Sequence, residues 1–159
     1  MTTEVRGVGV DMVDLDAFAA SLAAPGTRLT RAFSATERRQ CRERTESRGA
    51  ASGGTADPAR EDDPLARHLA ARWAAKEAVV KAWSAALYGA PPPIPPDLLR
   101  WSEIETVCDY WGRPSVRLAG EVARQVAATI GESARWNVSL SHDGGSAIAF
   151  VVLEVPGSG

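Results

Sequence analysis

The stretch Arg67–Leu87, with the sequence RHLAARWAAKEAVVKAWSAAL, decides the fold of this 159-residue chain. Its large apolar side chains recur at helical spacing and therefore share one side of a helix: Leu69, Trp73, Val80, Trp83 and Leu87. The residues between them are mostly strong helix formers, and Gly89 with the proline-rich stretch 91–96 ends the pattern. The sequence predicts a long central helix over residues 67–87.

The residues before this helix predict one strand and two shorter helices. Val8–Val13 alternates small or polar with apolar residues, as a half-buried strand does, and we expect the strand to end near Asp11. Apolar residues at helical spacing in Leu15–Leu22 predict a first helix that Pro25-Gly26 stops. Ser34-Ala35-Thr36-Glu37 has the form of a capping box, so a second helix should begin near Ser34.

The residues after the central helix predict a β-hairpin, a helix and a second pair of strands. In chain order these are strands at 104–110 and 116–118 around a turn at 111–114, a helix at 121–130, and strands at 136–141 and 147–155 around a turn at 142–145. Together with the first strand, this order predicts an α+β fold in which a small, largely antiparallel sheet packs on the long central helix.

The length and composition of the chain predict one domain, spanning residues 1–155. A hydrophobic fraction of 45% is enough to build a core in a chain of this size. Residues 45–64 consist of small, polar and charged residues with no apolar face, which is typical of a flexible insertion. The prolines at 91–96 are expected to form a second irregular connection.

Charge, apolar runs and cysteine count exclude several classes of protein. The net charge of −2 gives no general basic field, so we do not expect nucleic-acid binding. The apolar runs are shorter than the ~20 residues that cross a bilayer, which predicts no membrane segment and a cytoplasmic protein. Cys41 and Cys108 are too few for a disulfide framework and are expected to be reduced thiols.

Three charged residues have both a structural and a chemical interpretation. Asp11, with Asp14 and Asp16, fits the start or cap of a helix, and Glu77 with Lys81, four residues on, fits a surface ion pair. Alternatively, Asp11 and Glu77 hold Mg²⁺ while Lys81 faces a phosphate, because Mg²⁺ prefers one or two carboxylates with phosphate and water oxygens. Residue types and spacing leave both interpretations open.

His142 is one of only two histidines and comes where the last two strands should turn. Alternation places Ser139 and Ser141 on one face of the preceding strand, and Val138 and Leu140 on the other. A single histidine at a turn is more often solvated or held by a structural hydrogen bond than functional.

Four segments of the sequence are informative only when they are considered together. They are Gly7–Val13, Arg72–Ala82, the glycine-basic-proline turn in Asp109–Pro114, and Val138–Asp143. In this order and spacing they resemble the short, single-domain class of phosphopantetheinyl transferases. Arg72–Ala82 is the most specific segment. The resemblance covers nearly the whole chain except residues 45–64, residues 91–96 and the last few residues.

The resemblance implies an Mg²⁺-dependent enzyme that moves 4′-phosphopantetheine from coenzyme A to a serine of an apo acyl carrier protein and releases 3′,5′-ADP. It assigns Asp11 and Glu77 to the metal and Lys81 to the reacting phosphate. Glu77, directly or through a metal-bound water, is the candidate base for the serine proton, and which group moves the proton stays open. Five further residues match segments that line the nucleotide part of the coenzyme A site: Gly112, Arg113, Pro114, Ser141 and His142.

The same resemblance implies partners. Members of this class are typically homotrimers with active sites between neighbouring subunits, and they meet the acidic carrier protein with basic residues on and after the first helix. Arg28 and Arg31 are the candidates in this chain. The sequence departs from the class at Asp16-Ala17, where many relatives carry basic residues, so the carrier contact and the identity of the carrier stay open.

Two other functions fit the same residues. The first is a small Mg²⁺-dependent hydrolase of a nucleotide or pyrophosphate compound, which would release its product without a protein acceptor. The second is a non-catalytic oligomeric binding module, in which the carboxylates cap helices and an exposed helix face joins subunits.

Overall fold

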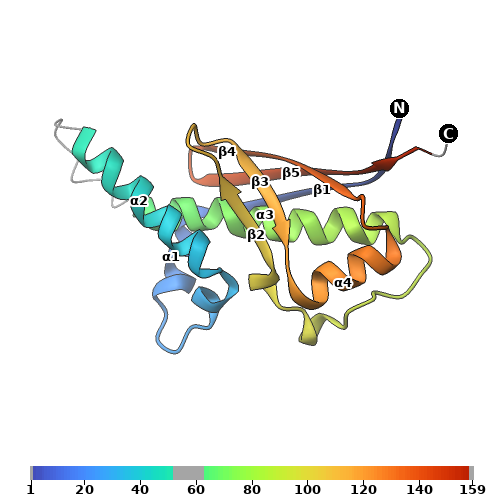
Figure 1. The fold of residues 1–159 in the computed structure, drawn as a ribbon. Coiled ribbons are helices and arrows are strands. Elements are labelled where there is room, and N and C mark those ends of the chain that lie inside the picture. The colour runs from blue at the N-terminus through green and yellow to red at the C-terminus, as the bar shows by residue number, and fades with distance from the viewer. Residues whose placement is uncertain (1, 52–62, 158–159) are drawn as a thin grey trace.

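Helix α3 (Pro64–Ala86) runs through the middle of the molecule, and the other elements pack around it (Figure 1). The computed structural model describes residues 2–51 and 63–157. Asp63 caps α3 by accepting a hydrogen bond from the Leu65 backbone N–H at 2.9 Å, with Pro64 in the first turn. The predicted central helix is confirmed. Among the described helices, none combines the length and apolar character that crossing a membrane requires.

A three-stranded antiparallel sheet covers one side of α3. Its order is β1 (Thr3–Asp14), β5 (Ser146–Pro156) and β4 (Arg135–Asp143), so the central strand is the last in the chain. The face toward α3 is built from fully buried side chains of β5: Ala147, Ala149, Val151 and Leu153. The antiparallel sheet packed on a long helix is therefore as predicted. β1 is longer than expected, because it continues past Asp11 to Asp14.

Gly7 and Gly9 set how closely β1 approaches α3. A Cβ atom on Gly7 would lie 2.0 Å from the carbonyl oxygen of Ala82, and one on Gly9 would lie 1.9 Å from that of Ala78. Only glycine fits at either position. Alternation along β1 then places Asp11 on this same face, next to the helix. Glycines in the strand and alanines in the helix thus bring the carboxylate of Asp11 to α3.

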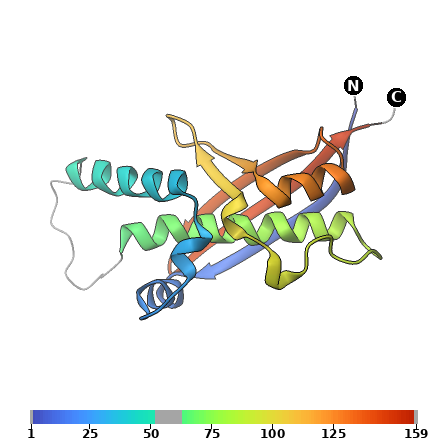
Figure 2. The ribbon, with the colours of Figure 1, turned by 60° about the horizontal axis from the view of Figure 1, so that its bottom comes forward.

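A second, two-stranded sheet packs on another side of α3. The strands β2 (Ile104–Cys108) and β3 (Pro114–Leu118) form a hairpin as predicted, but both bounds at the turn differ: β2 ends at Cys108, and Pro114, expected in the turn, begins β3. Helix α4 (Gly120–Thr129) follows with Val122 and Val126 buried. Figure 2 shows this hairpin on one side of α3 and β1 on the other. Three short 3₁₀ turns complete the connections: η1 (Leu29–Ala32), η2 (Pro96–Leu98) and η3 (Trp101–Glu103).

The two N-terminal helices begin as their sequences predict. In α1 (Leu15–Ala23) the cap is Asp14, which accepts from the Ala17 N–H at 2.7 Å. In α2 (Ala35–Ala51) the capping box is complete: the backbone N–H of Glu37 donates to Ser34 Oγ, and that of Ser34 donates to Glu37 Oε1, both at 3.1 Å.

Helix α2 is longer than predicted. Residues 45–51, assigned to a flexible insertion, continue the helix, and residues 52–62 lie outside the described part of the chain. The prediction was wrong for residues 45–51 because it required an apolar face. The outer part of α2 is almost entirely polar and rich in arginine and glutamate, which are good helix formers in solvent.

The turn between β4 and β5 is shorter than predicted. His142 and Asp143 belong to β4, where they pair with Ala147 and Ser146. Only Gly144 and Gly145 lie between the two strands, and Gly144 has a φ of +56°. A two-residue glycine turn closes such a hairpin without further residues, which explains why the strand includes His142.

Candidate active site

Asp11 and Lys81 meet where β1 crosses α3. The Lys81 ammonium donates to Asp11 Oδ1 and to the carbonyl oxygen of Val10, both at 2.9 Å. The Asp11 side chain is only 11% exposed, whereas that of Lys81 is 54% exposed, so the carboxylate lies below the surface and the lysine covers it. Asp11 therefore does not cap a helix, a role that Asp14 fills.

Glu77 completes this cluster from the preceding turn of α3. Its side chain is half-buried, and burial raises the pKa of its carboxyl group above the ordinary value. The negative charge of Asp11 raises that pKa further, while Lys81 and the Trp73 side chain act in the opposite direction. Asp11 thus lies close enough to Glu77 to disfavour the charge on Glu77, and a cation between them would be stabilised.

The donor set of this cluster fits a hard divalent cation. Asp11 and Glu77 offer carboxylate oxygens, and Mg²⁺ is usually held by one or two carboxylates together with phosphate oxygens and water. Within residues 2–51 and 63–157, no group of three or more His, Cys, Asp or Glu side chains is placed to hold a metal ion. Two carboxylates are therefore what the described chain offers to such an ion.

His142 lies against a second histidine near the start of α3. Its ring centroid is 6.4 Å from that of His68, edge to face. Burial lowers the pKa of His68 to about 4, and the charges of Arg72 and Arg48 add to the effect. Burial, with the charges of Arg67 and Arg48, also lowers the pKa of His142. Both rings are neutral at pH 7 and can accept as well as donate a hydrogen bond.

Ser141 and His142 point to opposite faces of β4. Val138 and Leu140 pack on the core beneath the sheet, as the alternation predicted, and His142 follows them on that face toward His68. Ser141 lies on the outer face, paired in register with Ile148 of β5. Two neighbouring residues expected to line one part of a cofactor site are thus separated by the sheet.

The turn with Gly112, Arg113 and Pro114 does not reach Asp11 within one chain. It ends the β2–β3 hairpin, across α3 from β1 (Figure 2). Gly112 has a φ of +88°, and a Cβ there would lie 2.6 Å from Nη2 of Arg44. The Arg113 side chain binds Asp109 through Nε at 2.6 Å.

Arg72 is a candidate site residue that reasoning from the sequence did not single out. Its side chain is 2% exposed, and it donates to the His68 carbonyl oxygen at 3.3 Å and to Cys108 Sγ at 3.7 Å. Its Nε has no partner, and no carboxylate among the described residues forms an ion pair with it. A buried guanidinium without a counter-ion is suited to an anionic ligand. The sequence signal that could have identified Arg72 is its positive charge on the buried side of the predicted central helix.

Lys76, directly before Glu77, has a structural role. Its ammonium is fully buried and donates to Glu37 Oε1 at 2.6 Å and to the carbonyl oxygens of Trp101 and Ile104. Glu37 Oε2 in turn accepts from the Thr106 N–H at 3.0 Å. Lys76 thus fixes α3 to α2 and β2, while its neighbour Glu77 faces the site.

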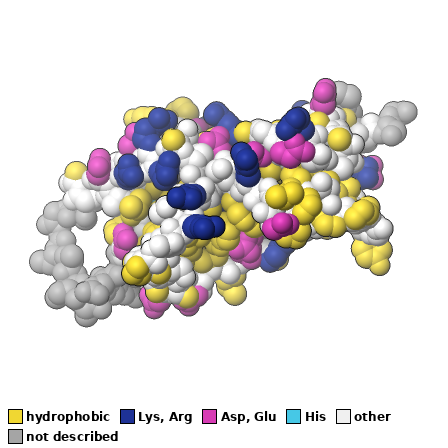
Figure 3. All heavy atoms as spheres, turned by 90° about the horizontal axis from the view of Figure 1, so that it is seen from below, with side chains coloured by type: hydrophobic (Ala, Val, Ile, Leu, Met, Phe, Trp, Pro, Cys, Tyr) yellow, Lys and Arg dark blue, Asp and Glu magenta, His cyan; other side chains and the backbone are white. Residues whose placement is uncertain are grey.

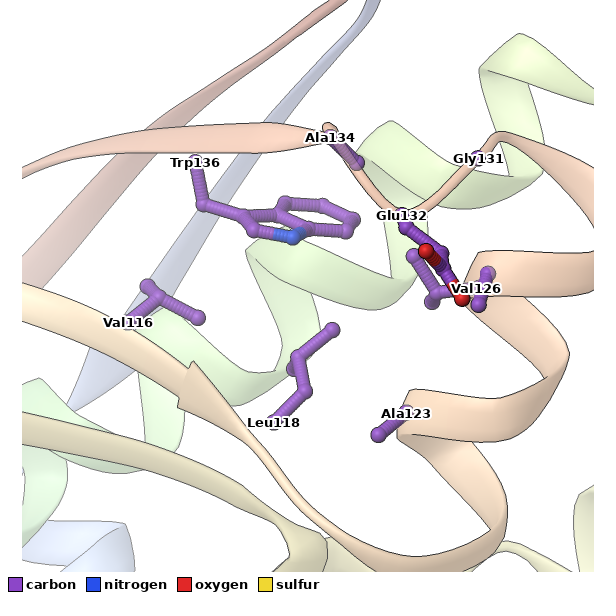
Figure 4. A pocket seen from close by; sticks show the side chains of 9 residues that line it. Val116, Leu118, Ala123, Val126, Gly131, Glu132, Ala134 and Trp136 are labelled. Carbon is purple, nitrogen blue, oxygen red and sulfur yellow. The ribbon is translucent and has the colours of Figure 1, made fainter.

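Of three cavities in the described part of the chain, none is lined by Asp11 or Lys81, and two of them border the β2–β3 hairpin. One, of about 250 Å³, lies between β3, β4 and α4, where the side chains of Val116, Leu118 and Trp136 surround it (Figure 4). It contains no predicted site residue. The other, of about 420 Å³, lies between α2 and the β2–β3 hairpin and is lined by Gln40, Glu43, Arg44, Ser47, Cys108, Asp109 and Tyr110.

Comparison with known proteins assigns the family. Residues 7–151 match the 4′-phosphopantetheinyl transferase superfamily. The holo-[acyl-carrier-protein] synthase of Corynebacterium glutamicum is 43% identical over 148 residues, which is 93% of this chain and 97% of that protein. The Mycobacterium tuberculosis protein of the same name is 42% identical over 153 residues, 96% of this chain and 98% of its own.

A solved structure described as the Chronobacterium ammoniagenes ACPS-CoA complex superimposes with a TM-score of 0.80 at 39% identity, covering 98% of this chain and 99% of its own. Sequence and fold thus agree over nearly the whole length. The chain belongs to the 4′-phosphopantetheinyl transferase superfamily.

Proposed function

We propose that this protein is a holo-[acyl-carrier-protein] synthase, which transfers 4′-phosphopantetheine from coenzyme A to a serine of an apo acyl carrier protein. The observation that carries the proposal is the cluster of Asp11, Glu77 and Lys81 at the β1–α3 contact. It lies in a chain that shares over two fifths of its residues with synthases of that name. A related fold is described as a complex with coenzyme A.

In this proposal Asp11 and Glu77 hold Mg²⁺. When bound, the ion would neutralise charge on the pyrophosphate of coenzyme A. Burial is the main cause of the raised pKa of Glu77, and the nearby charge of Asp11 adds to it, so a cation between the two carboxylates would offset part of this cost. Lys81, 54% exposed and already within reach of Asp11, can turn its ammonium toward a phosphate at the same place.

The transfer itself needs a proton acceptor and a charge stabiliser. The serine oxygen attacks the β-phosphorus, the bond from that phosphorus to the bridging oxygen breaks, and 3′,5′-ADP leaves. Glu77 is the proposed acceptor of the serine proton, either directly or through a water molecule. Lys81 stabilises the negative charge on the departing phosphate.

The nucleotide part of coenzyme A is proposed to lie toward the start of α3. Nine residues separate His68 from Glu77, which corresponds to roughly 13 Å along a helix axis. Arg72, buried without a carboxylate partner, and the neutral His142 lie at that end and suit phosphate and base groups.

The protein is proposed to act as a homotrimer with sites between subunits. In one chain Ser141 faces outward, and the Gly112-Arg113-Pro114 turn lies across α3 from Asp11. A neighbouring subunit that packs on the outer sheet face would cover Ser141 and could bring its own turn to the site. This arrangement would explain why residues of one predicted site are separated in a single chain.

The carrier protein is proposed to bind the basic side of the molecule. Figure 3 shows Lys and Arg side chains gathered over the region of α2. Arg28 and Arg31, just before α2, are both exposed. An acidic carrier would be attracted to such a surface. The free thiols Cys41 and Cys108 suit the reducing cytoplasm, where we place the reaction.

One assay tests the transferase directly. The protein is mixed with coenzyme A, Mg²⁺ and an apo acyl carrier protein, and the carrier is weighed by mass spectrometry. We expect one phosphopantetheine group on the carrier serine, and none when chelator replaces Mg²⁺. Release of 3′,5′-ADP without any carrier would instead favour the hydrolase. No adduct on any of several apo carriers would overturn the proposal.

A further inference from the structure

Cys108 lies at the end of β2 in surroundings that differ from those of a structural cysteine. Its thiol is partly exposed and lines the cavity of about 420 Å³ between α2 and the β2–β3 hairpin. The backbone of the same residue is fixed by the Gln40 side chain, which donates to the Cys108 carbonyl oxygen at 3.1 Å and accepts from its N–H at 3.0 Å. The sulfur is thus held at the wall of an open cavity.

The guanidinium of Arg72 faces this sulfur. Its Nη2 lies 3.7 Å from Cys108 Sγ, its side chain is 2% exposed, and its Nε has no partner. A guanidinium this close to the sulfur attracts an anionic reagent toward it. No described carboxylate pairs with Arg72, so no ion pair among the described residues offsets its charge.

The remaining charged residues that line the cavity favour the binding of an anionic ligand. Arg44 contributes a second guanidinium to the wall. The two acidic residues of the wall already face arginines: Asp109 binds Arg113 at 2.6 Å, and Glu43 lies 3.8 Å from Arg39. A small molecule that carries carboxylates or phosphates would therefore be attracted to the sulfur of Cys108.

The thiol of Cys41 is expected to react more slowly than that of Cys108. It is fully buried in α2, and burial raises the pKa of its thiol to about 11. It can react only when the surrounding structure opens, so its rate should be lower by on the order of 100-fold.

We propose that Cys108 is a site of reversible modification by small anionic disulfides, and that the modification inhibits the enzyme. The Cys108 thiol loses its proton to solvent, and its sulfur attacks one sulfur of the disulfide RS–SR. A Cys108 S–SR bond forms, the RS–SR bond breaks, and RS⁻ leaves. Cys108 is oxidised, one RS group is reduced, and any thiol in excess reverses the reaction.

The expected inhibition follows from the position of the RS group attached to Cys108. This inhibitory role rests on the proposed function. The attached group would occupy the space beside Arg72 and Arg44, and Arg44 in turn touches the Gly112 turn. It would compete with the proposed coenzyme A nucleotide for the same positive charges. Bound coenzyme A should conversely slow the modification.

The thiol chemistry is tested with glutathione disulfide on the folded wild-type protein. Intact mass and peptide mapping follow the wild type, Cys41→Ser and Cys108→Ser over time. We expect one glutathionyl group on wild type and Cys41→Ser, located at Cys108 and removed by dithiothreitol, with Cys108→Ser unmodified on the same timescale. Equal or faster reaction at Cys41, or no reaction at Cys108, would overturn the proposal whether or not the protein is a transferase.

The inhibitory effect is tested with the carrier assay on the same samples. Transfer by wild type should fall in proportion to Cys108 modification and return with dithiothreitol, while the rate of Cys108→Ser, whatever its starting value, should not change. Saturating coenzyme A should slow labelling by several-fold. If fully modified wild type transfers at its original rate, the inhibitory role is wrong.

Discussion

At the scale of single residues, the carboxylates of Asp11 and Glu77 are the proposed metal ligands, and each can be removed without opening the core. We expect Asp11→Ala and Glu77→Ala to lower the rate of carrier modification by more than about 100-fold, because both remove a proposed metal ligand. Stability should change by less than about 1 kcal/mol, since Asp11 contributes only a partly exposed ion pair with Lys81.

The measurements for this pair are the initial rate of carrier modification and urea unfolding. Glu4→Ala is the matched control, because Glu4 is an exposed acidic residue on the same strand. It should leave both quantities unchanged. If Asp11→Ala and Glu77→Ala both transfer at the wild-type rate, the site lies elsewhere.

His68 makes a prediction about pH and stability. Its pKa is about 4 in the folded protein, against 6.5 ordinarily, so between these values the unfolded chain holds a proton that the folded chain does not. Stability therefore falls as pH drops from 6.5 toward 4, and this contribution is constant below that range. His68→Phe should make the free energy of unfolding less dependent on pH across this window.

Urea unfolding at several pH values between 6.5 and 4 measures this effect. His68→Phe removes the group that titrates and keeps an aromatic ring against His142. A variant whose stability falls as steeply with acid as that of the wild type would show that His68 does not cause the loss.

At the scale of elements, the buried pair of Lys76 and Glu37 holds three segments together. Lys76→Met should cost about 3–5 kcal/mol, because the Glu37 carboxylate stays buried without its counter-charge. Adding Glu37→Gln should restore much of this loss, since the double variant no longer leaves an unpaired buried charge at this position. Chemical denaturation measures all three proteins.

Lys81→Met is the matched control on the same helix, because it removes an exposed lysine whose ion pair is worth less than about 1 kcal/mol. A cost for Lys76→Met as small as that of Lys81→Met would mean that the buried pair does not hold α2 and β2 to α3.

Elements with local signals could be predicted from the sequence. The capping box at Ser34 and Glu37 and the turn at Pro25-Gly26 depend on residues a few positions apart, and the structure forms both helices where they indicate. The end of β4 could not be located, because His142 is compatible with strand or turn. In the structure His142 pairs with Ala147 across the Gly144-Gly145 turn and is therefore part of the strand.

The same distinction applies to the candidate site. Asp11, Glu77 and Lys81 could be proposed because they fall in motifs with a chemical interpretation, and the structure brings them together. The roles of Lys76 and Arg72 could not be proposed from the sequence. Their partners lie 39 and 36 residues away, at Glu37 and Cys108, and periodicity alone treats a charged residue as a surface residue.

At the scale of the whole molecule, β1 and β5 carry apolar side chains on the outer face of the sheet that are exposed in the described part of the chain. Val10 pairs in register with Phe150, and Met12 with Ile148, so these side chains form one patch across β1 and β5. All are exposed, Met12 by 68%. A contiguous apolar patch on a sheet face usually marks an interface. Ser141 lies beside this patch, paired in register with Ile148, and the proposed homotrimer would cover it.

The assembly should therefore depend on this face. Phe150→Glu places a charge at the centre of the patch, and burying an unpaired charge between subunits would cost more than the contact provides. We expect wild-type protein to sediment with the mass of three chains, and Phe150→Glu to sediment as one chain and lose transfer. Tyr88→Glu is the matched control, because Tyr88 is 97% exposed but lies beyond α3, off the sheet. It should remain trimeric and active. A single-chain mass for active wild-type protein at assay concentration would exclude the trimer and require one chain to build the whole site.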